Sequence, residues 1–185
     1  MSIFKISWII LKIWNLKENE FLFEIFTFEY WKIKLKFKKN KKEKTLDLWY
    51  IIDFEVNIKK ELSINEAKNI KIKNEFSYLN KDYETIIEYL ELLKIINEKC
   101  PLNMPIFEIY NLVFQINELE NITNEKLIFA KLKLLNILWI LFLENKNQQI
   151  QKILSFIAKE SIKNILRLNW LNIENKIKLK NLTNI

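Results

Sequence analysis

The chain has 185 residues, which allows one domain or two small ones with a sizeable core. It contains no histidine and one cysteine, which excludes Ser-His-Asp and Cys-His catalysis, histidine-ligated metals and haem, a disulfide framework and multi-cysteine zinc sites. Half of the residues are apolar, 29% are charged and the net charge is +7, a composition typical of a folded globular protein.

Short β-branched and aromatic runs, separated by polar clusters, dominate roughly the first 76 residues. We expect strands at residues 3–13, 21–28, 31–37, 48–58 and 67–72. Five short strands at this spacing favour a small closed barrel of the OB type over a sandwich, which usually needs about seven strands.

The positive charge is concentrated in and after the third of these strands. Residues 32–44 hold eight lysines and one acid, whereas the rest of the chain holds equal numbers of basic and acidic residues. Residues 32–38 alternate strictly between lysine and apolar side chains, so the lysines would share one face of a strand, about 7 Å apart. That distance is close to the spacing of successive phosphates. The candidate nucleic-acid-binding residues are therefore Lys32, Lys34, Lys36, Lys38, Lys39, Lys41, Lys42 and Lys44.

This segment has two interpretations. It is either the solvated face of a strand in a lysine-rich protein or a surface that binds polyphosphate, and the neutrality of the remaining chain favours the second. Lysine is a point charge without planar base recognition, so it predicts affinity with little sequence preference. An acidic lipid surface is a weaker fit, because no basic amphipathic helix accompanies the strand.

After residue 76 the apolar period becomes helical, and the apolar stripes are those of helices that bury one face. We expect helices from an N-cap at Asn80 to Cys100, from Pro105 to about Ile116, from Thr123 or Asn124 to about Leu138, and from Ile150 to Ile165. The predicted fold is α+β: an N-terminal five-stranded OB-like β-barrel at residues 1–76, followed by an all-α helical bundle domain of four or five helices at residues 77–185.

The sequence offers little catalytic chemistry. The acid pairs Asp53 with Glu55 and Glu118 with Glu120 are expected by chance among 23 acids, and Cys100 has no histidine to activate it. We therefore expect a protein that is not an enzyme, with no catalytic residues, no cofactor and no metal site.

The chain shows no sign of a membrane or secretory role. Its longest apolar stretch, residues 134–143, is too short to span a bilayer, and its first residues lack a basic n-region and a cleavage site. We expect a cytoplasmic protein that does not bind membranes.

Several short motifs follow one another in the first third of the chain: Trp8-Ile-Ile-Leu-Lys12, Glu18-Asn-Glu20, Ile25-Phe-Thr27, Tyr30-Trp31-Lys32 and Leu46-Asp-Leu-Trp49 to Val56. In this order they resemble the start of the bacterial recombination mediators of the RecO family, whose basic segment falls where Lys36 to Lys44 lies here. Leu132-Lys-Leu-Leu135 to Trp139 is similar to a helix end of that family. The zinc-binding cysteine pairs of many members are absent, so zinc is not carried over.

The resemblance implies a DNA repair and homologous recombination mediator. Such a protein binds single-stranded DNA, anneals complementary strands and assists RecA loading together with a RecR-like protein and the C-terminal tail of the single-strand-binding protein. In the helical domain Lys131 and Lys133 are candidates for a partner site, but the sequence does not separate them from ordinary surface lysines. The alternative function is that of a structural RNA-binding protein, ribosome-associated for instance, which would use the same basic strand face.

Glycine is absent and tryptophan occurs six times, a combination that codon bias toward A and T does not produce. Tryptophan also stands at positions where the RecO family has glycine or where a turn favours it. Those positions are Trp8, Trp31, Trp49, Trp139 and Trp170. One hypothesis is that the gene reads UGA as glycine, so that these tryptophans are glycines in the natural protein. The other is that Trp8, Trp31 and Trp49 stack on bases beside the lysines. No glycine is expected at Trp14.

Overall fold

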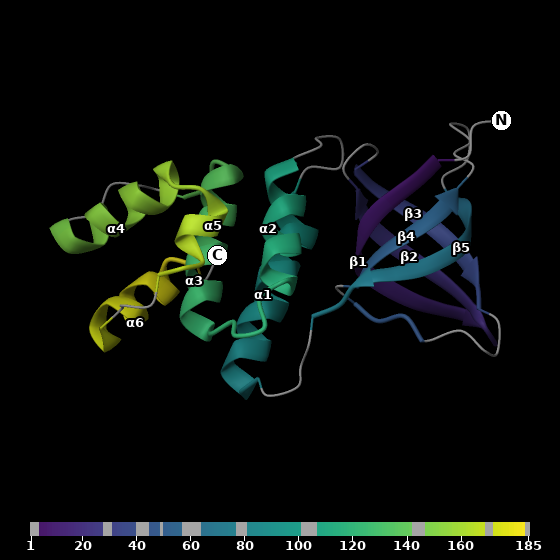
Figure 1. Cartoon of the computed structure of the whole chain (residues 1–185), viewed down its shortest axis with the longest axis horizontal. Helices are drawn as coiled ribbons and strands as arrows, with labels where there is room; N and C mark the ends of the chain where they lie inside the picture. The colour runs from purple at the N-terminus through teal and green to yellow at the C-terminus, as the bar shows by residue number, and fades with distance from the viewer. Residues whose placement is uncertain are drawn as a thin grey trace. The chain divides into compact units, whose positions relative to one another are not determined.

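The computed structural model describes residues 4–27, 31–39, 45–48, 50–56, 64–76, 81–100, 107–141, 147–168 and 172–183. The chain divides into two compact units, one of Met1–Phe76 with Pro101–Tyr110 and the other of Ser77–Cys100 with Asn111–Ile185. Figure 1 shows the order of elements, a five-stranded sheet followed by helices. The predicted α+β class is confirmed at this level.

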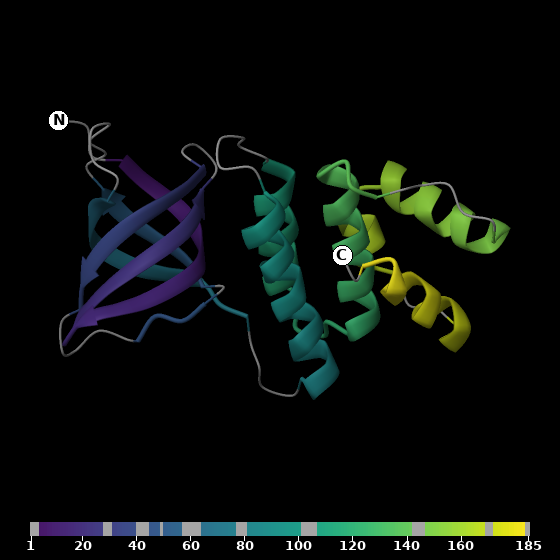
Figure 2. The same ribbon diagram turned by 180° about the vertical axis from the view of Figure 1, so that it is seen from behind.

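The strands are β1 (Phe4–Lys17), β2 (Glu20–Thr27), β3 (Trp31–Lys38), β4 (Ile51–Val56) and β5 (Ile64–Asn74). They pair in the order β1-β2-β3-β5-β4, and β4 also pairs with β1, so the sheet closes into a barrel (Figure 2). All pairs are antiparallel except β3 with β5. All five predicted strands exist, with different ends.

The alternating apolar residues of the strands fill the inside of this sheet. The core contains nearly inaccessible side chains from β1 to β5, including Ile10, Phe23, Leu35, Phe54 and Ala67. Because successive side chains of a strand point to opposite faces, this core directs the residues between them outward. In β3 the outward residues with described side chains are Lys34, Lys36 and Lys38.

The first two strands form a hairpin that is longer than predicted. β1 continues to Lys17 and pairs there with Glu20, which leaves only Glu18 and Asn19 in the turn. Asn19 has φ 60°, a left-handed conformation that asparagine tolerates better than most residues. Residues 15–17, which fall between the predicted strands, therefore belong to β1.

The second unit is helical. Its elements, with the shared helix α2, are α1 (Tyr83–Lys99), α2 (Phe107–Asn117), α3 (Asn124–Ile137), α4 (Gln148–Lys159), α5 (Ile162–Ile165) and α6 (Ile173–Asn181). One core of this unit joins α3 to the later helices and includes Phe129, Leu154, Ile165 and Leu179. None of the helices in the described ranges is both long and apolar enough to cross a membrane.

Two predicted helix boundaries differ from the structure. The N-cap of α1 is Asp82, whose carboxylate accepts from the amide of Thr85 at 2.6 Å, and the predicted cap Asn80 lies outside the described residues. The helix predicted at 150–165 is two helices, because Ser161 caps a new start at α5. A continuous apolar stripe does not reveal such a break, since both pieces bury the same side.

The C-terminus of α3 has the backbone of a glycine-ended helix. Trp139 has φ 58° and is 93% exposed, and the amides of Trp139 and Ile140 donate to the carbonyls of Asn136 and Leu135. These two bonds are those of a Schellman motif, whose left-handed residue is usually glycine. The structure thus places tryptophan at a position that favours glycine, as the sequence suggested.

Candidate nucleic-acid interface

The lysines of β3 lie on one face, as the alternation predicts. Lys34 and Lys38 are exposed, Lys36 is half-buried, and Leu35 and Phe37 between them are buried. Lys39 follows the strand and its ammonium donates to Oγ1 of Thr45 at 2.7 Å. Lys41, Lys42 and Lys44 lie outside the described residues, as does the side chain of Lys32.

Acidic residues of the neighbouring strands flank these lysines. In the register of β2 and β3, Glu24 pairs with Lys34 and Glu20 pairs with Lys38. On the other side of β3, Glu66 of β5 pairs with Lys36. The positive charge that looked isolated along the chain is therefore interleaved with negative charge across the sheet. The sequence contained a signal for this arrangement. The segments 20–27 and 31–38 both alternate and are separated by only three residues, a spacing typical of two paired strands.

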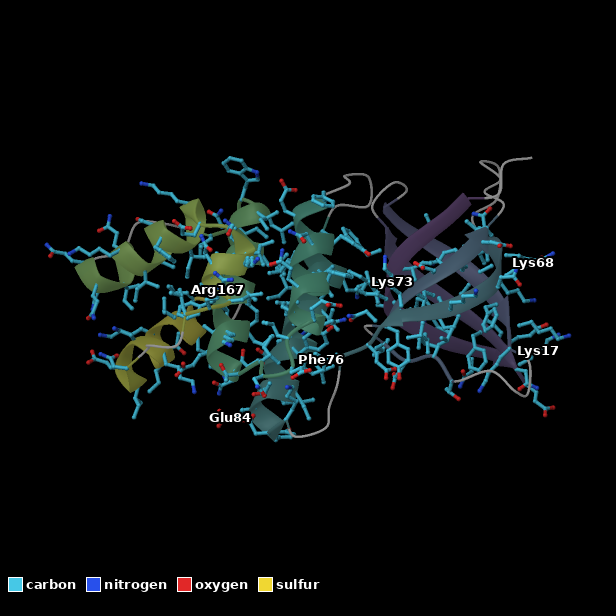
Figure 3. All side chains as sticks on the ribbon, viewed as in Figure 1. Lys17, Lys68, Lys73, Phe76, Glu84 and Arg167 are labelled. Carbon is cyan, nitrogen blue, oxygen red and sulfur yellow. The ribbon has the colours of Figure 1, made fainter. Side chains whose placement is uncertain are left out.

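Two lysines of β1 complete the surface, and the sequence analysis did not include them. Lys12 pairs with Glu24 and Lys17 pairs with Glu20, so each glutamate stands between a lysine of β1 and a lysine of β3. Figure 3 shows Lys17 projecting from the strands. We call this surface the outer face of β1–β3, and its members are Lys12, Trp14, Lys17, Glu20, Leu22, Glu24, Lys34, Lys36 and Lys38.

The outer face carries five lysines and two glutamates, a net charge of +3. Nζ of Lys36 lies 3.0 Å from Oε2 of Glu20. The hydrogen bond from Lys36, together with the positive charge of Lys36, Lys17 and Lys38, lowers the pKa of Glu20 below its ordinary value, so Glu20 is ionised at neutral pH. No side-chain hydrogen bond or ion pair joins Lys34 or Lys38 to another residue in the described part of the chain, in contrast to Lys36.

The backbone row of Lys32 differs from the rows of the outer face. In register, Lys32 pairs with Phe26 and Phe26 pairs with Ile9, and both apolar side chains are fully buried. The row next to Lys32 is therefore closed to solvent, unlike the rows at Lys34, Lys36 and Lys38.

Three other residues considered from the sequence are Asp53, Glu55 and Cys100, and each has a place in the strand or helix packing. Asp53 and Glu55 lie on β4 opposite Lys71 and Lys68 of β5, and Glu55 also accepts from Asn69 at 2.7 Å. Cys100 is a buried thiol at the end of α1. Within the described ranges, no group of three or more cysteine, aspartate or glutamate side chains could hold a metal ion.

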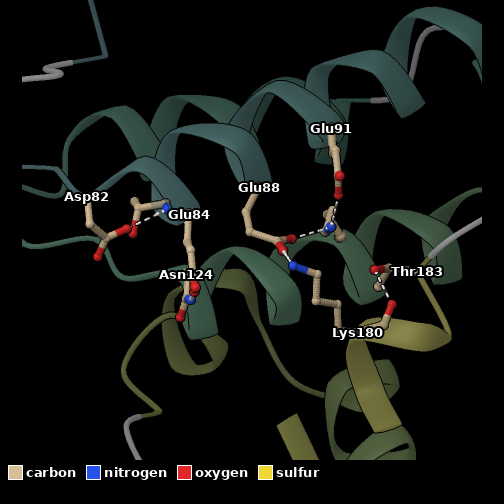
Figure 4. A network of polar contacts seen from close by, with 9 residues as sticks. Asp82, Glu84, Glu88, Glu91, Asn124, Lys180 and Thr183 are labelled. Carbon is tan, nitrogen blue, oxygen red and sulfur yellow. Dashed lines mark hydrogen bonds and ion pairs between the residues drawn. The ribbon is translucent and has the colours of Figure 1, made fainter. Parts of the chain in front are cut away.

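In the helical unit, Lys131 is part of a buried ionic cluster. Its side chain is fully buried and its ammonium pairs with Glu88 and, at 2.7 Å, with Glu91. Glu88 is itself buried and pairs with Lys180 of α6 at 2.6 Å, which raises the pKa of Lys180 (Figure 4). The cluster holds α1, α3 and α6 together, so Lys131 is not a surface lysine.

Lys133 has a capping role. Its ammonium donates to the carbonyl oxygens of Ile157, Ala158 and Glu160 at 2.8 to 3.0 Å. These are among the last carbonyls of α4, which lack partners within the helix and carry its negative dipole end. Like Lys131, it is occupied by the helical unit itself, and neither lysine is free for a partner groove.

Comparison with family models finds no family that matches this chain, and comparison with curated proteins finds no significant match. The functional argument therefore depends on the outer face of β1–β3 and on the motifs in the sequence.

Proposed function

We propose that this protein binds single-stranded nucleic acid through the outer face of β1–β3, as a DNA repair and recombination mediator that is not an enzyme. The observation that carries the proposal is the double row of lysines, Lys12 and Lys17 on β1 and Lys34, Lys36 and Lys38 on β3, on one face of a small closed sheet. Ammonium groups on a rigid sheet neutralise phosphates and release their counterions.

The strand order supports an OB-type barrel as the frame of this face. Five strands close on themselves with β5 inserted between β3 and β4, and the outer face spans β1, β2 and β3, with its lysines on β1 and β3. In OB folds the surface of strands 2 and 3 binds oligonucleotides. An OB-like barrel followed by a helical bundle is also the architecture that the RecO-like motifs imply.

The proposed activity is annealing of complementary strands in the cytoplasm. Strands repel each other through their phosphates, and a surface that neutralises phosphates on both lowers that repulsion without any catalytic group. The resemblance adds cooperation with a RecR-like protein and with the tail of the single-strand-binding protein in loading RecA, and no residue of this chain is assigned to these partners.

The test compares two triple variants with equal change of charge. Lys34→Gln, Lys36→Gln and Lys38→Gln together should reduce single-stranded DNA binding and annealing at least tenfold. The matched control, Lys68→Gln, Lys71→Gln and Lys73→Gln on β5, should change both by less than about threefold, because these lysines lie off the face. Equal loss in the two variants would contradict the proposed interface.

A competition experiment separates DNA from RNA. Labelled single-stranded DNA is displaced by unlabelled single-stranded DNA or by a structured RNA of equal length, and annealing is measured in parallel. The proposal predicts annealing and stronger displacement by the single strand. Stronger displacement by the structured RNA, without annealing, would instead identify the structural RNA-binding protein.

A further inference from the structure

An exposed indole lies in the middle row of the outer face of β1–β3. Trp14 is 38% exposed and pairs across β1 and β2 with half-buried Leu22, which in turn pairs with Lys36 of β3. The row on one side is Lys12–Glu24–Lys34 and the row on the other side is Lys17–Glu20–Lys38. The apolar pair Trp14–Leu22 is thus enclosed by charged rows.

The backbone at Trp14 does not require glycine. Among the described residues, the positive φ angles belong to Asn19, Asn69 and Trp139, and Trp14 lies in the stretch Lys12–Asn15 of β1 that pairs with β2 in unbroken register. Trp139, by contrast, has the left-handed backbone that glycine favours. The left-handed backbone explains Trp139 as a residue at a position that favours glycine. It does not explain Trp14, so the reason for an exposed indole there must concern the side chain.

The ring of Trp14 is held near a cation. Nζ of Lys12 lies 6.0 Å from the ring centroid, at the outer limit of cation–π attraction. A base that stacks on the ring can displace this weak contact at little cost. The released ammonium of Lys12 would then be available to another phosphate of the bound strand.

The spacing of the sheet suits a nucleotide strand that follows the lysines of β3. Adjacent strands lie about 4.8 Å apart, so Trp14 on β1 is about 10 Å from the lysine row on β3, with Leu22 between them. A phosphate at Lys34 or Lys36 leaves room for its sugar over Leu22 and its base over Trp14. Only an unpaired base has a free π-face to offer, since bases inside a duplex are already stacked.

We infer that Trp14, with Leu22 beside it, is a stacking platform for an unpaired base, and that it gives the outer face its preference for single strands over duplexes. This inference rests on the proposed function, because the lysines must first bind the backbone. Stacking on an aromatic side chain is sequence-tolerant, in keeping with lysines that recognise only phosphates.

The experiment measures the affinity of the full chain for a labelled oligothymidylate of about 16 nucleotides and for a duplex of equal length, over a range of salt concentrations. Trp14→Ala should lower affinity for the single strand roughly tenfold at every salt concentration, with an unchanged salt slope, because stacking is not an ionic contact. Trp14→Phe should retain most of the affinity. Affinity for the duplex should change less than about twofold.

The matched control is Trp139→Gly, which removes an exposed indole from the other unit and should bind like the original chain. The thermal midpoint of each variant identifies loss of folding, and Trp14→Phe keeps the test decisive if Trp14→Ala is unstable. Unchanged single-strand affinity in Trp14→Ala, or equal loss for single strand and duplex, would overturn the platform but leave the lysine interface standing. No binding of single strands by the original chain at low salt would overturn the proposed function itself.

Discussion

Oε2 of Glu20 lies 3.0 Å from Nζ of Lys36, so the middle lysine of β3 is partly neutralised by an acid of the neighbouring strand. Lys36 is therefore less available to a phosphate than Lys34 and Lys38 on either side of it. The pair also sets the pH dependence of the face. Because the pKa of Glu20 is lowered, the pair persists at neutral pH and opens only as pH falls through that lowered value.

Removing the charge of Glu20 should strengthen nucleic-acid binding. Glu20→Gln frees Lys36 from a competing carboxylate and raises the net charge of the face, so Lys36 should bind its phosphate more strongly and affinity for single-stranded DNA should increase several-fold. The measurement is a salt titration by fluorescence anisotropy. Glu55→Gln on β4 is the matched control and should leave affinity unchanged. A weaker or unchanged affinity in Glu20→Gln would show that Lys36 does not contact phosphate.

Replacing Trp139 with glycine should stabilise the protein. A residue with a Cβ in the left-handed conformation costs about 1–2 kcal/mol, part of which glycine loses again through its freer unfolded chain. We expect Trp139→Gly to raise the free energy of unfolding by about 1 kcal/mol and the thermal midpoint by about 3 °C. Trp139→Ala removes the indole but keeps the Cβ, and it should bring no comparable gain. Equal gains in both variants would assign the effect to the exposed indole rather than to the backbone.

Position 139 also tests whether this tryptophan is a glycine in the natural protein. If UGA is read as glycine, peptides of the protein from its natural source will carry glycine at 139, and the gene will have UGA at that codon. Trp14, whose backbone is ordinary β-strand, is the position where we expect UGG and a genuine tryptophan. UGG at all six codons would end the recoding hypothesis.

Truncation of Lys131 should be strongly destabilising. Its fully buried ammonium compensates the buried carboxylate of Glu88, and loss of one partner of such a pair costs about 3–5 kcal/mol. Lys131→Met should show this loss in urea denaturation. The double variant Lys131→Met with Glu88→Leu removes both charges and should recover most of the stability. A double variant as unstable as the single one would show that packing, not the unpaired carboxylate, causes the loss.

Lys180 should contribute stability up to alkaline pH. Its hydrogen bond with Glu88 raises its pKa above the ordinary 10.5, so the contribution is fully present below 10.5 and is lost as pH rises through the raised value. Compared with Lys180→Gln, the original chain should be more stable at neutral pH, and the difference should shrink above pH 10.5. Lys178→Gln, which removes an exposed pair with Glu174 on the same helix, is the control and should have a smaller effect. A difference that grows at alkaline pH would contradict the assignment.

The sequence predicted what depends on local periodicity. The alternation at 32–38 correctly placed Leu35 and Phe37 in the core and Lys34 and Lys38 in solvent, and the predicted start of a helix at Thr123 or Asn124 agrees with the N-cap of α3 at Thr123. It did not predict what depends on register between strands. The glutamates beside the lysines, and the contribution of Lys12 and Lys17, follow from pairing across the sheet, which the composition of one segment does not contain.

Helix ends and buried charges were also beyond the sequence. Asp82 and Asn80 are both favourable N-cap residues, and the sequence alone does not show which of them precedes the first turn of α1. Lys131 has apolar neighbours in the sequence of α3, but so do many surface lysines. Its burial depends on the pairs with Glu88 and Glu91, which lie 40 or more residues earlier in the chain.

The salt dependence of single-stranded DNA binding tests the central claim most directly. If the five lysines of the outer face contact phosphates, log K should fall with log salt with a slope of about −3.5. Replacing Lys34, Lys36 and Lys38 with glutamine should reduce the slope to about −1.4. The same slope in the chain and the triple variant, or affinity that does not change with salt, would contradict binding through this face.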